Sequence, residues 1–82
     1  MFGKKEKKII ITFHTMAESI AFENECKKLV NVKELGRLIP VPREISSGCG
    51  ISWCAPLDKR SEIEHILENN SLEWEAVHEI EI

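Results

Sequence analysis

The chain has 82 residues, of which 43% are hydrophobic and 30% are charged, and its formal net charge is −3. A chain of this length forms one domain, because it buries only about 60 to 65% of its unfolded surface. The composition is that of a soluble globular protein, and the negative charge argues against nucleic acid as the main partner, since phosphate binding needs a basic face. The longest apolar run is too short to cross a membrane or to serve as a secretory signal.

The basic cluster at residues 4–8 is interpreted as a solvated chain end. We therefore expect residues 1–7 to be a flexible segment and residues 8–82 to form the single domain. The chain contains three cysteines, an odd number in a sequence without a secretory signal. Thiols stay reduced in the cytoplasm, so we predict a cytoplasmic location.

The N-terminal part of the chain predicts a strand followed by a helix. The segment "KIIITF" at residues 8–13 is short, apolar and β-branched, as is typical of a buried strand. Thr15 follows as a candidate N-cap, and Glu18 stands three positions later, which is the spacing of a reciprocal capping box. We therefore expect a helix that begins at about Met16, with Phe22 on its buried face.

Two further strands and a second helix are predicted in the middle of the chain. The segment "ELGRLIPV" at residues 34–41 favours extended structure, and its proline ends the strand near Ile39 because proline cannot donate to a ladder. The segment "GISWCA" at residues 50–55 predicts the third strand. Residues 56–70, "PLDKRSEIEHILENN", predict the second helix with Asp58 as its cap.

The clearest period-2 alternation lies at the C-terminus and predicts a fourth strand. Its apolar positions are Leu72, Trp74, Ala76, Ile80 and Ile82, and its acidic positions are Glu73, Glu75, Glu79 and Glu81. We expect the apolar face to lie in the core and the acidic face in solvent. The order β-α-β-β-α-β predicts a ferredoxin-like α+β fold, in which two helices cover one face of an antiparallel four-stranded sheet with strand order 4-1-3-2.

Several polar residues are predicted to meet at one edge of this sheet. The topology places His14, the start of the first helix, residues 40–50 and residues 69–71 at the same edge. Cys49 would therefore lie near a helix N-terminus and within reach of His14 and Arg43. Each of these groups favours a thiolate over a thiol, because positive charge and oriented dipoles stabilise an anionic sulfur.

Cys49 stands between two glycines in the segment "SSGCG". Gly48 and Gly50 allow backbone conformations that other residues avoid, and they leave the sulfur open to a large partner. Ser46 and Ser47 could add hydroxyl donors. A glycine-rich turn with an incidental cysteine explains the same spacing, so the residues alone leave both interpretations open.

The segment "GRLIPVPREISSGCGISW" at residues 36–53, together with "ITFHT" at residues 11–15, resembles the selenium/sulfur (Se/S) carrier-like protein family. The similarity runs from about Lys8 to Ile80. The resemblance implies that Cys49 accepts sulfur or selenium as a persulfide or selenosulfide and passes it on. Its partners would be a protein donor, of the desulfurase or sulfur-relay type, and a protein acceptor. This chemistry describes a thiol-based carrier more than a turnover enzyme.

The other cysteines favour structural roles. Cys54 is a candidate second thiol, but extended chain would separate it from Cys49 by about 16 Å and place the two on opposite faces. We therefore interpret Cys54 as a small apolar residue of the strand, and Cys26 as a packing residue of the first helix. No paired C-x-x-C or H-x-x-x-H spacing occurs, so we predict neither a metal site nor a cofactor.

Two other functions stay open on the sequence. A regulatory or protein-interaction module of the same fold would keep its partner after Cys49→Ser, whereas a carrier would lose all function. A redox sensor would form a disulfide between the Cys49 residues of two chains, which a non-reducing gel detects. A homodimer through an edge strand is also compatible with the predicted topology.

Overall fold

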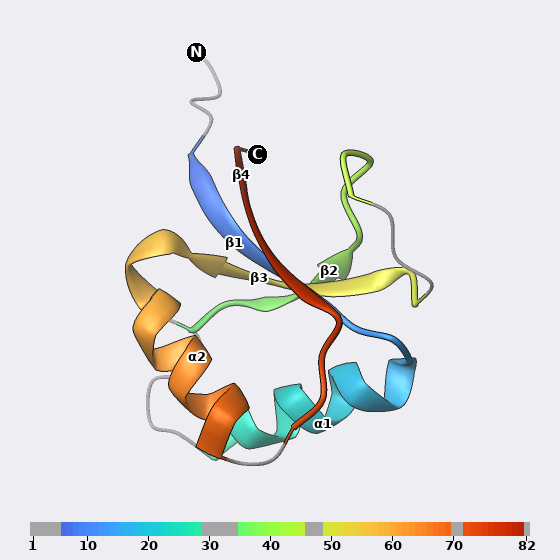
Figure 1. Cartoon of the computed structure of the whole chain (residues 1–82), viewed down its shortest axis with the longest axis vertical. Coiled ribbons are helices and arrows are strands. Elements are labelled where there is room, and N and C mark those ends of the chain that lie inside the picture. The colour runs from blue at the N-terminus through green and yellow to red at the C-terminus, as the bar shows by residue number, and fades with distance from the viewer. Residues whose placement is uncertain (1–5, 29–34, 46–48, 70–71, 82) are drawn as a thin grey trace.

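The computed structural model describes residues 6–28, 35–45, 49–69 and 72–81. Its elements in chain order are β1 (Lys7–Thr12), α1 (Met16–Lys27), β2 (Arg37–Pro40), β3 (Ile51–Pro56), the 3-10 turn η2 (Leu57–Lys59), α2 (Arg60–Asn69) and β4 (Ala76–Glu81). The strands form one antiparallel sheet in the order β2-β3-β1-β4. Figure 1 shows both helices on one side of this sheet. The predicted ferredoxin-like α+β fold and its strand order are therefore confirmed.

The N-terminal segment predicted to be flexible, residues 1–7, lies largely outside the described residues, and β1 begins at Lys7. None of the described helices combines the length and the apolar character that a membrane-spanning helix needs.

The hydrophobic core lies between the sheet and the helices. Its buried members are Ile9, Ile11, Phe13, Phe22, Cys26, Leu35, Trp53, Ala55, Ile63, Ile66 and Leu67. The ring of Phe22 meets that of Trp53 edge-on, with 5.0 Å between the ring centroids. The indole nitrogen of Trp53 donates a 2.7 Å hydrogen bond to the Leu35 carbonyl oxygen. The one polar atom of this buried side chain is therefore satisfied, which keeps the free energy of burying it favourable.

The backbone of Gly36 passes close to β3. Its φ angle is 114°, a conformation that side chains rarely allow. A Cβ atom at this position would collide with the carbonyl oxygen of Cys54, and it would lie 2.8 Å from the indole nitrogen of Trp53 and 2.9 Å from the Cα of Ala55. Glycine is therefore required here both by the backbone conformation and by the space available.

The start of α1 follows the predicted cap. Thr15 has extended backbone angles, and its hydroxyl accepts a 3.2 Å hydrogen bond from the N–H of Glu18. The Glu18 carboxylate accepts from the N–H of His14, one residue before the cap, instead of from that of Thr15. The second hydrogen bond of the capping box is thus shifted by one residue, from the N–H of the cap to the N–H of the residue before it. This hydrogen bond joins His14 to the first turn of the helix.

The start of α2 differs from the prediction. Asp58 lies inside η2, and α2 begins at Arg60, so the prediction that Asp58 caps this helix is wrong. The chain makes a 3-10 turn directly after the proline at the end of β3, which moves the first α-helical turn further along. The buried face of α2 is as expected, because Ile63, Ile66 and Leu67 are its buried residues.

The last strand is shorter than predicted, and its faces are reversed. It begins at Ala76, and Val77 is the strand residue that packs against the helix-side core. The residues that alternate with Val77, namely Ala76, His78 and Ile80, lie on the side of the sheet away from the helices. The register shows this, because they pair with Thr12, Ile10 and Lys8 of β1. The cause is that residues 72–75 are not part of the strand, so the alternation does not run unbroken through them. Leu72 and Trp74 nevertheless pack against the core.

Candidate functional site

One edge of the sheet gathers the ends of β1 and β2 and the starts of β3 and β4. Thr12, the last residue of β1, pairs with Ser52 of β3 and with Ala76 of β4. The last residue of β2 pairs with the first residue of β3. The start of α1 and the loop between β2 and β3 therefore share this edge, as the topology predicted for His14 and residues 40–50.

The loop that carries Cys49 is tied to the sheet at its base. The N–H of Val41 donates to the Gly50 carbonyl oxygen at 3.1 Å, and inside the loop the N–H of Ile45 donates to the Pro42 carbonyl oxygen at 3.0 Å. Ile45 is only 9% exposed, so its side chain anchors this half of the loop. Cys49 lies directly before the closing residue and is half-buried. Its backbone is therefore held close to the sheet edge.

Gly50 has the unusual backbone conformation that its sequence context predicted. Its φ angle is 82°, and a Cβ atom built on it would have no heavy atom within 4 Å. Glycine is favoured at this position by the backbone conformation and not by a lack of space, because a side chain would have room here. Ser46, Ser47 and Gly48 lie outside the described residues, as does the predicted turn at residues 70–71, so their roles beside Cys49 stay predictions.

Arg43 is exposed within the turn that the Pro42–Ile45 hydrogen bond closes. It forms no ion pair with Glu44 or with another side chain in the described part of the chain. A guanidinium in this position can bind a carboxylate or another anion that approaches the loop.

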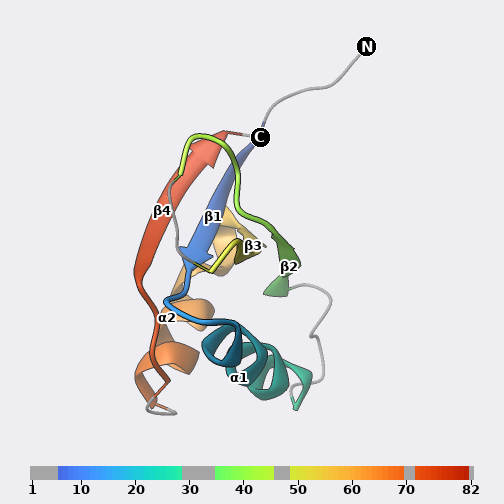
Figure 2. The same cartoon turned by 90° about the vertical axis from the view of Figure 1, so that its right-hand side faces the viewer.

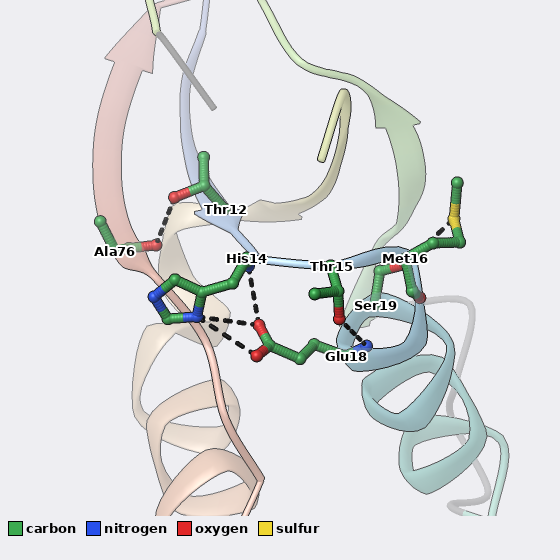
Figure 3. A network of polar contacts seen from close by, with 7 residues as sticks. All are labelled: Thr12, His14, Thr15, Met16, Glu18, Ser19 and Ala76. Atoms are coloured by element: carbon green, nitrogen blue, oxygen red, sulfur yellow. Dashed lines mark hydrogen bonds and ion pairs between the residues drawn. The ribbon is translucent and has the colours of Figure 1, made fainter. Parts of the chain in front are cut away.

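His14 is bound to Glu18 at the start of α1 (Figure 3). Its ring Nδ1 lies 3.1 Å and 3.2 Å from the two carboxylate oxygens of Glu18, in addition to the 2.7 Å hydrogen bond from its backbone N–H. When Nδ1 carries the proton and donates it to the carboxylate, Nε2 presents a lone pair. Figure 3 shows the ring on the side of Ala76 and β4, whereas Met16 lies on the other side of the helix start. Cys49 leads into β3, which borders β1 on the side away from β4.

Glu18 is a further polar residue of this edge. The sequence pattern predicts it as a capping residue but does not predict its contact with the His14 ring. Burial by itself raises the pKa of Glu18, but the hydrogen bonds from the backbone and ring of His14, the charge of that ring and the hydrogen bond with Thr15 lower it overall. The carboxylate is thus held in its ionised form. The spacing of His14 and Glu18, four residues apart at a helix start, is a signal that could have indicated the pair.

The other two cysteines are placed less favourably for reaction than Cys49. All three are thiols and not disulfides. Burial raises the pKa of Cys26 to about 12, with the charges of Glu23 and Glu25 acting in the same direction. Burial also raises the pKa of Cys54, although the positive charges of two neighbouring side chains oppose it. A protonated thiol is a poor nucleophile, so packing is the role that these surroundings favour for both.

Comparison with known proteins identifies a family but no individual relative. No curated protein and no solved structure shows significant similarity to the chain. The model of the family described as "Putative Se/S carrier protein-like" matches residues 8–79, which include Cys49 and the edge that holds it. The chain therefore belongs to the Se/S carrier-like family.

Proposed function

We propose that Cys49 receives a sulfur or selenium atom from one protein and hands it to another. The observation that carries the proposal is the family match over residues 8–79, because it includes the loop of Cys49. The other thiols support the choice of residue, since burial raises the pKa of both Cys26 and Cys54. Cys49 is the remaining candidate, and it lies at the sheet edge next to a tied loop base.

Loading would be an exchange between a thiol and a persulfide, with no net oxidation. The Cys49 thiolate attacks the terminal sulfur of the donor protein's persulfide, a new S–S bond forms at Cys49, and the donor's S–S bond breaks. The electron pair of the broken bond leaves with the donor thiolate, which takes up the proton that Cys49 released. Delivery repeats the step with an acceptor thiolate as the attacking group. A selenosulfide follows the same sequence with selenium as the transferred atom.

The loop of Cys49 and the sheet edge that it shares with the start of α1 contain groups suited to an anionic sulfur. Arg43 is exposed in the same loop, and a loaded persulfide is anionic, so the guanidinium can stabilise it or bind an acidic group of the partner. The start of α1 adds the positive end of a helix dipole to the edge. His14, oriented by Glu18, has its ring on the β4 side of β1, where it can exchange a proton with a group of the partner that reaches this side of the edge.

Mass spectrometry of tryptic peptides tests the proposal. The chain is incubated with a cysteine desulfurase and cysteine, or with selenocysteine and a selenocysteine-specific enzyme, and the peptide that contains Cys49 is compared before and after reduction. We expect this peptide to gain the mass of one sulfur or selenium atom and to lose it on treatment with a thiol reductant.

Two cysteine variants control this experiment. Cys54→Ser should load as the wild type does, whereas Cys49→Ser should not load. Loading that persists in Cys49→Ser, or its absence in the wild type with both donors, would contradict the carrier role. A disulfide-linked dimer of the wild type on a non-reducing gel, in place of a loaded monomer, would favour the redox sensor instead.

A further inference from the structure

The sheet face turned away from both helices, which we call the outer face, is covered at its centre by the chain itself. Ile10 of β1 is fully buried, and so are Thr12 and Ser52, which pair in register. Ile9 and Ile11 belong to the helix-side core, so Ile10 points to the outer face, because strand side chains alternate between faces. A single sheet layer leaves such a residue open to solvent unless another segment lies over it.

The segment that lies on this side is the first half of the loop between β2 and β3. Figures 1 and 2 show residues 41–45 rising from the sheet on the side away from the helices. Within the described ranges, two buried apolar residues lie outside the helix-side core, and these are Ile10 and Ile45. Both lie on the same side of the sheet, and contact between them removes both side chains from water.

The polar groups beneath the segment have their partners within the sheet. The hydroxyl of Thr12 donates to the carbonyl oxygen of Ala76, and that of Ser52 donates to the carbonyl oxygen of Ile39, both at 3.4 Å. Neither hydroxyl therefore needs a hydrogen bond from the covering segment. The contact over the centre of the outer face is one between apolar side chains.

Beyond its base, the segment depends on Ile45 for its attachment to the sheet. In the described part of the chain, its backbone hydrogen bonds are the one from Val41 to Gly50, which closes the base, and the one from Ile45 to Pro42, which lies within the segment. Residues 43 and 44, between them, are exposed. Ile45 is thus the side chain that anchors the segment on the outer face.

Cys49 lies between two fixed points of this loop. Ile45 precedes it by four residues, and Gly50, bound to Val41, follows it directly. The loop is longer than the two to five residues of an ordinary hairpin, so the base alone would leave a long stretch without an anchor. Burial of Ile45 shortens the part of the chain in which the thiol can change position.

We infer that Ile45 is a positioning residue for Cys49, which it holds at the sheet edge by packing against Ile10 on the outer face. The inference rests on the proposed function, because the place of the thiol matters only if a donor's persulfide has to reach it. The attacking sulfur must meet the donor's S–S bond in a defined geometry. A thiol that is already held in place needs less ordering when the donor protein binds.

Removing the anchor should slow the transfer by a measurable factor. Burial of an isoleucine side chain favours the packed arrangement over the released one by roughly 10- to 100-fold. Alanine keeps only the Cβ of that side chain, so the segment should be released in a substantial share of Ile45→Ala molecules. We expect loading of Cys49 by a cysteine desulfurase and cysteine to slow about three- to tenfold.

Two measurements on the full chain test the positioning role. NMR relaxation of the Cys49 amide is compared in isotope-labelled wild type, Ile45→Ala and Ile45→Val, and we expect added motion in the alanine variant and near wild-type values in the valine variant. The initial rate of loading is then compared with the rate of alkylation by iodoacetamide, both from the mass of the peptide that contains Cys49. Loading should slow, whereas alkylation, which needs no protein partner, should stay the same or become faster.

A matched pair of core variants controls for loss of stability. Ile10→Val removes one methylene group from the contact on the outer face, and Ile63→Val removes the same group from the helix-side core. The two should lower the midpoint of thermal unfolding to a similar degree, but only Ile10→Val should add motion at Cys49. If Ile45→Ala does not fold, the double variant Ile10→Val, Ile45→Val takes its place.

Several results would overturn the inference. Unchanged relaxation of the Cys49 amide in Ile45→Ala is one, and equal added motion in Ile63→Val is another. Alkylation that slows as much as loading is a third, because the reactivity of the thiol and not its position would then have changed. Normal loading of Ile45→Ala rejects the positioning role and leaves the carrier role intact. If the wild type does not load, the carrier role fails, and the relaxation data still decide whether Ile45 positions Cys49.

Discussion

Replacing Gly36 by alanine should destabilise the fold much more than replacing Gly50 by alanine. Both glycines have positive φ angles, 114° and 82° respectively. They differ in their surroundings, because a Cβ at Gly36 would collide with the Cys54 carbonyl oxygen and crowd the Trp53 indole, whereas a Cβ at Gly50 would meet nothing within 4 Å. Comparing the two variants therefore separates the free-energy cost of the backbone conformation from that of the steric clash.

The expected magnitudes follow from these two contributions. A side chain in the left-handed region costs about 1–2 kcal/mol, and this cost applies at both positions. Overpacking a dense interior adds about 1–3 kcal/mol, and this cost applies only at Gly36. We expect a loss of about 2–5 kcal/mol for Gly36→Ala and about 1–2 kcal/mol for Gly50→Ala. A domain of this length has roughly 4–12 kcal/mol of stability in total, so the first change removes a large part of it.

Urea unfolding followed by circular dichroism and tryptophan fluorescence measures both variants. Thermal unfolding should give a midpoint about 4–8 °C lower for each kcal/mol lost. Equal losses for the two variants would refute the reasoning, because they would mean that the start of β2 does not approach β3 as closely as the structure has it.

Three further predictions concern the core and its titrating groups. Trp53→Phe should cost about 1–3 kcal/mol in urea unfolding, because it leaves the buried Leu35 carbonyl without its donor, and an unchanged midpoint would argue against that hydrogen bond. The pKa of Glu18 is lowered below 4.5 in the folded state, so its carboxylate adds stability above that pH, and this stability is lost as the pH falls through the folded pKa. Glu18→Gln should therefore flatten the acid side of a plot of melting temperature against pH, and parallel curves for variant and wild type would contradict this assignment. The pKa of Cys26 rises from 9.0 to about 12, so folding loses stability as the pH increases through that range. Cys26→Ala should lose less stability there, and early alkylation of Cys26 in the native protein would show that the thiol is not buried.

The element order could be predicted from the sequence because local patterns determine it. The β-branched run at residues 8–13 and the Thr15–Glu18 spacing are physical signals of a strand and a helix start, and both elements form where these signals lie. With the order known, the handedness and pairing rules leave few topologies, so the shared edge of His14 and residues 40–50 could be predicted as well.

The side of the sheet to which each strand residue points could not be predicted with the same success. Period-2 alternation separates two faces of a strand, but it does not say which one meets the helices. In β4 the alternation also runs through Leu72 and Trp74, which precede the strand and pack against the core, and extending it into the strand assigns Ala76 and Ile80 to the wrong side. The same limitation applies to Lys8 and Arg37, whose charges act on Cys54 only because three strands pair as they do.

Contacts between distant segments are the other feature that local patterns do not contain. Gly36 in the sequence is compatible with an ordinary strand start, and its close approach to the carbonyl of Cys54 depends on the packing of β2 against β3. The hydrogen bond from Trp53 to the Leu35 carbonyl is another contact of this kind. Both join residues that are distant along the chain, and each is set by the register of the finished sheet.

The small size of the domain determines where the proposed chemistry can take place. A chain of 82 residues has too little interior to enclose a substrate, and here that interior is occupied by the packing of two helices on one face of the sheet. A thiol on a loop tied at Val41 and Gly50 must therefore meet its reaction partner at the surface of the protein. Thiol exchange itself distinguishes poorly between visiting thiols, because its rate depends mainly on ionisation and access. Selection among partners then has to come from contacts beyond the reacting atoms, and the exposed Arg43 in the same loop is a group able to provide one.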